Sequence, residues 1–117
     1  MKKIILLAVL SSFVLSEDYF CNYKGGFSGS NEGIVIIERQ YQGVIVNNQN
    51  VKTKFKVLRD DSEVLLFQYI ENNLDGTLGM IDTRSIKKKS NRYTHHMISM
   101  TYPEVSYYFE GKCLKND

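Results

Sequence analysis

The sequence predicts an all-β domain, a small antiparallel meander of about seven or eight strands that closes as a barrel or packs as a sandwich. Short segments rich in β-branched and aromatic residues alternate with turn residues, and no helical period persists for long. The clearest unit spans residues 63–82, where an apolar run over 64–70 meets a polar turn and a second apolar run begins at Thr77. We expect this hairpin to lie at the centre of the domain, with the other strands on either side.

The first sixteen residues are predicted to be a secretory signal peptide. Lys2 and Lys3 precede an apolar stretch over residues 4–15 that is too short to cross a bilayer. Val14 and Ser16 supply small side chains before a cut ahead of residue 17. An uncleaved anchor or a buried first strand is the alternative. Residues 17–117 then form a single β domain without a transmembrane segment.

The charge of the predicted mature domain excludes one class of partner. The full chain has 15 Lys and Arg residues against 13 Asp and Glu residues, and two of the lysines leave with the leader. The mature domain therefore carries equal numbers of basic and acidic side chains, whereas proteins that bind nucleic acid usually carry a basic field. We expect no nucleic-acid partner.

The two cysteines, Cys21 and Cys113, lie near the two ends of the predicted domain. In an oxidising compartment such a pair is most simply a disulfide, which places the first and last strands close together, as in a closed barrel. Reactive or metal-binding thiols are the alternative, and the lack of a CxxC spacing disfavours them. The leader and the disulfide together predict a periplasmic or secreted protein, of bacterial type.

The remaining elements follow from local composition. Gly, Ser and Asn over residues 24–33 predict a loop, Asn over 47–50 a tight turn, and Lys over 87–91 an exposed hairpin tip. Residues 51–58 alternate between lysines on one face and Val, Thr and Phe on the other. The expected strands cover residues 19–23, 34–39, 41–46, 51–58, 64–70, 77–86, 92–102 and 105–112, the second and third of them either separate or one strand bent near Gly43.

Three of these strands are apolar on both faces, over residues 34–37, 44–46 and 64–67. An antiparallel sheet with one solvated face normally alternates between apolar and polar residues. We therefore expect a second buried surface, which the other layer of a sandwich, a dimer interface or a partner would provide.

The turn of the central hairpin partly fits a calcium-binding loop. Residues 71–82 place Asn73, Asp75 and Asp82 at EF-hand ligand positions, with Gly76 at the sharp turn. The first and last ligand positions carry Glu and Asp where the motif has Asp and Glu, and both flanks predict strand. We expect an ordinary Asp-Gly hairpin turn, and no resident metal or cofactor.

His95 and His96 are adjacent in a predicted strand, so their side chains leave opposite faces and cannot bind one metal ion together. No spacing ties either histidine to a serine, or to the acidic turn at Asp60 and Asp61, as a hydrolytic site requires. We expect a protein that is not an enzyme, with a calcium-dependent or hydrolytic module as a further alternative.

Two features suggest a surface that binds a partner. Lys87, Lys88 and Lys89 form a cationic tip, a composition that also suits a solvated hairpin end. Tyr107 and Tyr108 must face opposite sides of their strand, so at least one of them lies outside the core. Tyrosine is favoured both at interfaces and in strands.

Phe20-Cys21 near the start and Lys112-Cys113-Leu114 near the end give a layout that resembles the periplasmic inhibitors of c-type lysozyme. That resemblance implies an antiparallel barrel of about one hundred residues with a cysteine near each end and a protein partner in the cell envelope. The family's inhibitory Ser-Gly motif lies mid-chain and runs into Tyr, whereas the similar string here, residues 28–33, comes earlier and lacks that Tyr.

We therefore expect an exported, non-enzymatic barrel that binds a protein of the periplasm or extracellular space, as an inhibitor or accessory subunit does. A lipocalin-like carrier of a small apolar ligand is the alternative. A continuous interior cavity would favour the carrier, and a filled interior with an exposed apolar patch would favour the protein binder.

Overall fold

Eight antiparallel strands follow one another around a closed barrel in the computed structural model, which describes residues 17–26, 31–101 and 104–116. The predicted all-β fold is confirmed, and of the two predicted forms the barrel is the one observed. The leader expected over residues 1–16 lies outside the described residues. The strands are β1 (Glu17–Gly25), β2 (Asn31–Gln40), β3 (Gly43–Asn48), β4 (Val51–Asp60), β5 (Val64–Asn72), β6 (Leu78–Lys87), β7 (Arg92–Ser99) and β8 (Val105–Asn116).

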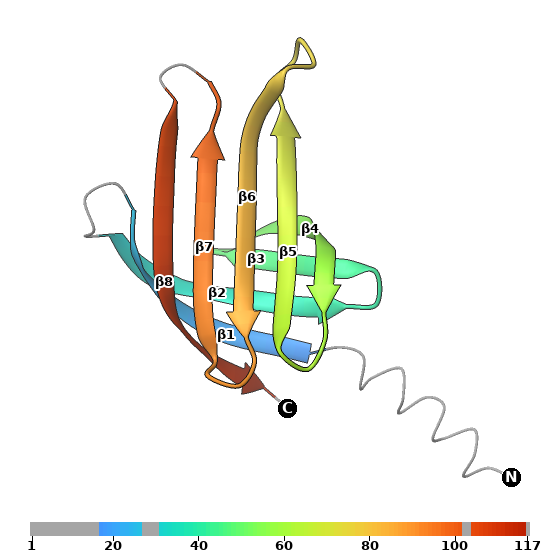
Figure 1. Cartoon of the computed structure of the whole chain (residues 1–117), viewed down its shortest axis with the longest axis vertical. Helices are drawn as coiled ribbons and strands as arrows, with labels where there is room; N and C mark the ends of the chain where they lie inside the picture. The colour runs from blue at the N-terminus through green and yellow to red at the C-terminus, as the bar shows by residue number, and fades with distance from the viewer. Residues whose placement is uncertain (1–16, 27–30, 102–103, 117) are drawn as a thin grey trace, which may run out of the picture.

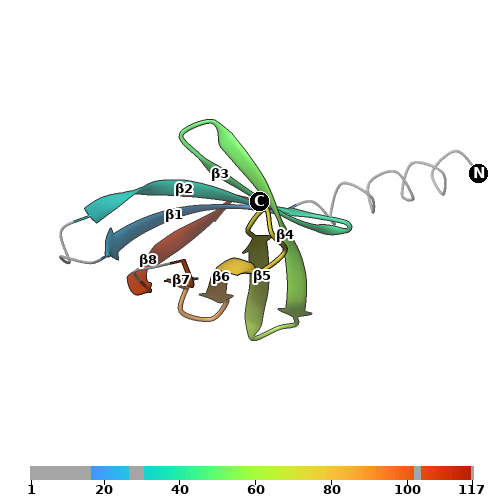
Figure 2. The ribbon, with the colours of Figure 1, turned by 90° about the horizontal axis from the view of Figure 1, so that it is seen from above.

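The barrel is flattened into two halves whose strands cross. In Figure 1, β5, β6, β7 and β8 stand side by side, and β1, β2 and β3 run across behind them. Figure 2 shows the same arrangement from above, with β1 to β3 forming one layer and β5 to β8 the other. The space between these two layers is the barrel interior.

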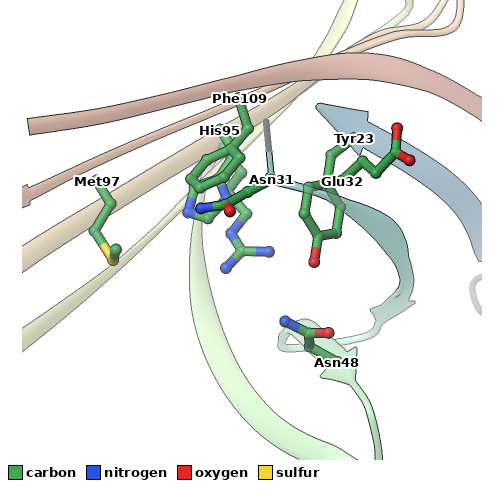
Figure 3. Close-up of a pocket in the computed structure, with 8 residues that line it drawn as sticks. Tyr23, Asn31, Glu32, Asn48, His95, Met97 and Phe109 are labelled. Atoms are coloured by element: carbon green, nitrogen blue, oxygen red, sulfur yellow. The ribbon is translucent and has the colours of Figure 1, made fainter. Parts of the chain in front are cut away.

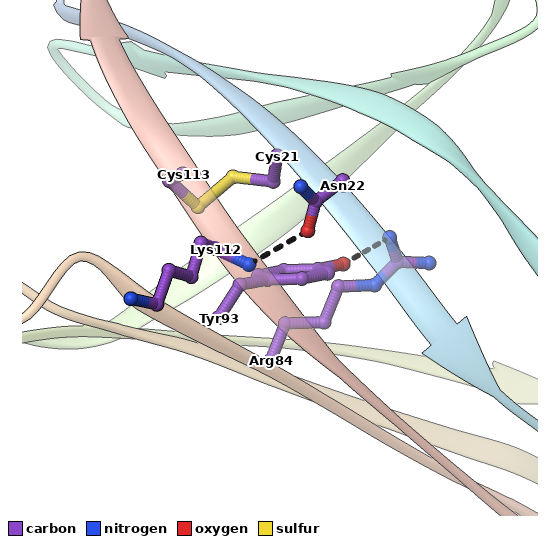
Figure 4. Close-up of a disulfide and its surroundings, with 6 residues drawn as sticks. All are labelled: Cys21, Asn22, Arg84, Tyr93, Lys112 and Cys113. Atoms are coloured by element: carbon purple, nitrogen blue, oxygen red, sulfur yellow. Dashed lines mark hydrogen bonds between the residues drawn. A yellow bond between two sulfur atoms is a disulfide. The ribbon is translucent and has the colours of Figure 1, made fainter.

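The pairing of β1 with β8 closes the barrel, and the predicted disulfide lies in it. Cys21 pairs with Cys113, with the two Cα atoms 3.9 Å apart (Figure 4). Beside the bridge, Asn22 Oδ1 accepts a hydrogen bond from the backbone N–H of Lys112 at 2.9 Å. A Cβ at Gly111 would lie 1.8 Å from the backbone oxygen of Asn22, so glycine permits this close approach. The disulfide is compatible with an oxidising extracellular or periplasmic location.

Inward-facing side chains fill one part of the barrel with an apolar core. Phe55 and Phe67 meet there edge to face, with ring centroids 5.6 Å apart. The largest fully buried side chains include Tyr19, Tyr93, Phe67, Ile37, Leu65, Ile86, Val35 and Val44. These residues come from six strands, so the core fixes the two layers against each other.

The structure corrects the predicted boundaries between β1 and β3. The loop expected over 24–33 is shorter, because β1 runs to Gly25 and β2 begins at Asn31. β2 and β3 are two strands rather than one bent strand, since Gln40 pairs with Gly43 across a two-residue turn. The tight turn expected over 47–50 is present, with positive φ at Gln49 and Asn50.

Of the covers expected for the doubly apolar strands, the second layer of a sandwich is absent from the described chain, while a dimer interface or a partner stays a prediction. The outward-facing side chains of the doubly apolar strands are only partly buried or exposed: Ile34 is 69% exposed and Ile70 is 52% exposed. The barrel closes on itself, so no second sheet covers its outer face. The central hairpin of β5 and β6 is confirmed, with Leu65, Phe67 and Ile86 facing inward.

No helix that could cross a bilayer occurs in the part of the chain that the structure describes.

Candidate functional site

The barrel interior is not filled throughout. A hollow of about 620 Å³ opens between β1 to β3 on one side and β6 to β8 on the other. Figure 3 shows labelled side chains from both layers around it, with the Glu32 carboxylate pointing away from the others. The residues that line it are Tyr23, Asn31, Glu32, Asn48, Arg84, His95, Met97 and Phe109. Volumes of this size are typical of sites for small molecules.

The strand register brings three of these residues into one row. Arg84 pairs with His95, and His95 pairs with Phe109, so the three side chains point inward from β6, β7 and β8. The rings of His95 and Phe109 stack with centroids 5.0 Å apart and planes 23° apart. One wall of the hollow is therefore a flat aromatic surface beside a guanidinium group.

Arg84 is the centre of a buried polar network. Its Nε and Nη2 donate to the two carboxylate oxygens of Asp82, each at 3.0 Å. Its Nη1 donates to the Tyr93 hydroxyl at 3.0 Å (Figure 4). The guanidinium also lies over the Phe55 ring, 5.1 Å from the centroid. The Arg84 and Asp82 side chains are 10% and 6% exposed, so solvent screens this ion pair little.

His95 adjoins this network. Its Nε2 lies 3.0 Å from Asp82 Oδ1, which is hydrogen-bonding distance, and its side chain is only 12% exposed. The Asp82 carboxylate is therefore in contact with both Arg84 and His95.

Burial and charge together set the protonation of the network. Burial alone disfavours the charged form of Asp82, but the nearby His95 and Arg84 outweigh it and hold the pKa of Asp82 below its ordinary value. Burial, with help from the Arg84 charge, lowers the pKa of His95. Burial also raises the pKa of Tyr93 to about 12. Near neutral pH, Asp82 and Arg84 are therefore charged, while His95 and Tyr93 are neutral.

The lowered pKa of His95 predicts a loss of stability in mild acid. The unfolded chain takes up a proton on this side chain as the pH falls through about 6.5, whereas the folded chain does so only at lower pH. We expect the free energy of unfolding to fall from pH 7 downward and to level off below the folded pKa of His95. Urea titrations between pH 7.5 and pH 5 measure this.

The control for that prediction is His95→Asn, which removes the titrating group and should flatten the profile over the same range. Asp82 contributes a separate loss, because a lowered carboxyl pKa removes stability only below about pH 4. Equal slopes between pH 7 and pH 5 in both proteins would show that His95 is not the cause.

The opposite wall of the hollow depends on one glycine. Tyr23 on β1 pairs with Gly33 on β2, and a Cβ at Gly33 would lie 2.5 Å from the Tyr23 hydroxyl. Glycine at this position leaves room for that ring, which meets Phe109 edge to face at 5.6 Å between centroids. Asn48, at the end of β3, borders this hollow and a neighbouring one of about 330 Å³, and both are also lined by Arg84.

The residues predicted as a weak metal site are not brought together. Asp75 lies in the exposed β5–β6 turn, where its Oδ1 accepts hydrogen bonds from the backbone and the hydroxyl of Thr77 at 2.9 and 2.6 Å. Asn73 lies in the same turn and donates to the Thr77 hydroxyl at 3.1 Å. Asp82 lies inside the barrel, held by Arg84. The described residues contain no cluster of His, Cys, Asp and Glu side chains suited to a metal ion.

The three lysines predicted for a binding surface lie at one end of the barrel. Lys88 is paired, because its Nζ donates to Asp60 Oδ1 at 2.6 Å. Lys87 and Lys89 border a shallow groove of about 500 Å³ together with Arg59 and Val64. Glu63 and Ser90 complete its lining, and Glu63 forms an ion pair with Arg59, so the groove is not purely cationic.

The two predicted tyrosines face opposite sides of β8, as expected. Tyr107 pairs with Met97 on the inward-facing row, whereas Tyr108 pairs with His96 on the outer face and is 49% exposed. Lys87 pairs with Arg92 at the start of β7. The partner-binding role of these lysines and tyrosines stays a prediction.

The hollow and its polar network were not predicted from the sequence. One signal was available in the sequence of β6. Asp82, Arg84 and Ile86 are alternate residues, so two opposite charges lie on the same face of the strand as an apolar residue. Charged side chains on a buried face are rare unless they are paired. That pattern predicts a buried ion pair.

Comparison with known proteins gave no match to a protein-family profile, to a curated protein or to a solved structure. The barrel and the cysteine near each end agree with the layout that the resemblance to the lysozyme inhibitors implied, and the inhibitory role stays a prediction.

Proposed function

We propose that this protein is a non-enzymatic binding protein whose barrel opening takes up a small amphipathic molecule. The observation that carries this proposal is the hollow of about 620 Å³ with an aromatic wall and a guanidinium beside it. Of the two functions weighed from the sequence, the carrier of a small ligand is therefore favoured, with a ligand that is partly polar rather than wholly apolar. The disulfide and the predicted leader support export to a bacterial periplasm or to the medium.

The lining residues match a ligand with two chemically different parts. Phe109, Tyr23 and Met97 offer aromatic and thioether surface to an apolar body. Asn48 and Arg84 offer polar groups on the side nearer the second hollow. Most of the lining residues are polar or charged, so the ligand that fits combines an apolar body with polar groups.

The lining favours binding rather than catalysis. The described lining offers no serine, threonine or cysteine as a nucleophile.

Titration with N-phenyl-1-naphthylamine, a neutral apolar fluorophore, tests the proposal. We expect saturable enhancement of its fluorescence at one site per chain. Phe109→Ala should weaken binding about tenfold, because it removes the aromatic wall. Tyr108→Ala is the matched control, since the adjacent side chain leaves the opposite face of the same strand. The proposal fails if the fluorophore does not bind, or if both variants weaken it equally.

A protein partner is the second candidate, and one observation favours it. Leu114, Phe20 and Ile36 form an apolar row across the outer face of β8, β1 and β2. Leu114 is 72% exposed and Phe20 is 39% exposed. Exposed apolar groups on neighbouring strands are typical of interaction surfaces. Capture of one protein from the native compartment by the wild type, and not by Phe20→Ser, is the test.

A further inference from the structure

Arg84 has hydrogen-bonding capacity that the protein does not use. A guanidinium carries five N–H groups, and the contacts to Asp82 and Tyr93 use three of them. Within the described residues the other two N–H groups have no partner. They belong to a side chain that borders both hollows and is 10% exposed.

The unused N–H groups lie beside the aromatic wall of the hollow. Arg84 and His95 are cross-strand partners, and the His95 ring stacks on Phe109 with centroids 5.0 Å apart. A ligand with a polar group next to an apolar body could therefore contact the guanidinium and the aromatic wall at once.

The chemistry of these groups selects an anion with two coplanar oxygens. Guanidinium N–H groups match the oxygens of a carboxylate in a paired geometry, and hydrogen bonds between charged groups are about twice as strong as neutral ones. The Asp82 carboxylate already uses one side of Arg84 in this way, which shows that the site accepts the geometry. The two amides at the opening, Asn31 and Asn48, are uncharged and do not repel an anion.

We propose that the ligand is an aromatic or otherwise apolar carboxylate, with its carboxylate on the unused N–H groups of Arg84 and its apolar body against Phe109 and Tyr23. This inference rests on the proposed function and specifies the class of ligand. Glu32 at the rim opposes an anion, and its exposure to solvent weakens this repulsion without removing it.

The test is displacement of bound N-phenyl-1-naphthylamine from the full-length protein by two matched competitors. The competitors are 1-naphthoate and 1-naphthalenemethanol, which share one ring system and differ in the carboxylate. We expect 1-naphthoate to displace the fluorophore at a concentration at least about tenfold lower than the concentration of 1-naphthalenemethanol that gives the same displacement. Equal displacement by both would overturn this inference and leave the proposed function standing, whereas failure of the fluorophore to bind would remove the proposed function itself.

Rim variants keep the test independent of folding. Glu32→Gln removes an exposed negative charge from the lining and should strengthen 1-naphthoate binding without changing that of the alcohol. Asn48→Asp adds a charge there and should weaken the carboxylate alone. Glu71→Gln is the matched control, because it makes the same change of charge at an exposed position outside the lining. Equal effects of Glu32→Gln and Glu71→Gln would contradict a carboxylate seated in the hollow.

The role of Arg84 is tested with the double variant Asp82→Asn/Arg84→Met, which removes both charges together. We expect it to lose the preference for 1-naphthoate while it still binds 1-naphthalenemethanol, because the apolar walls remain. Retention of the full preference in a folded double variant would show that Arg84 does not hold the carboxylate.

Discussion

The variant that combines Cys21→Ser with Cys113→Ser is expected to lose roughly 4 kcal/mol of unfolding free energy. The two cysteines are 92 residues apart in sequence, so the bridge restrains almost the whole described chain in its unfolded state. It also joins β1 to β8, the pairing that closes the barrel. Urea denaturation followed by circular dichroism measures the loss as a shift of the midpoint.

The matched control is the wild type with its disulfide reduced. This reduced protein should unfold at nearly the same urea concentration as the serine variant. The wild type and the serine variant should differ in stability only under oxidising conditions. Hydrogen exchange should then accelerate most in β1 and β8, which remain joined by their backbone ladder and by the hydrogen bond from Lys112 to Asn22. A serine variant as stable as the oxidised wild type would contradict this account of the disulfide.

The fold was predictable because its signals are local. The apolar runs and turn residues of the β5–β6 hairpin define two strands without reference to the rest of the chain, and the structure places them at Val64–Asn72 and Leu78–Lys87. The disulfide needed only the positions of Cys21 and Cys113. The break between β2 and β3 was harder, because the turn residues Tyr41 and Gln42 are not typical turn formers.

The candidate site was not predictable in the same way, because it depends on register between distant strands. His95 was weighed as one of two adjacent histidines, and only the pairing with Arg84 and Phe109 shows what surrounds it. Tyr23 and Asn48 come from the other half of the barrel and from strands early in the chain. Nothing in their local sequence ties them to β6 or β7. The side chains of the site are brought together by cross-strand pairing rather than by nearness in sequence.

Asp82→Asn is expected to destabilise the protein by about 3 kcal/mol or more, which is the usual effect of removing one partner from a buried ion pair. The amide has nearly the shape of the carboxylate, so packing is preserved. The charge of Arg84 is then left buried beside Tyr93 and Phe55 without its counter-ion. Urea denaturation at pH 7 measures the loss, and His95 is neutral at that pH and does not compensate.

The double variant Asp82→Asn/Arg84→Met separates the ion pair from the packing. It removes both buried charges and keeps an unbranched apolar side chain against the Phe55 ring, so it should regain most of the stability lost in Asp82→Asn. Recovery in the double variant would mean that the ion pair contributes little net stability to this barrel. Such a result would agree with the proposed role of Arg84 in ligand binding. If the double variant is no more stable than Asp82→Asn, the network is structural, and the ligand site must be sought in the remaining lining of the hollow.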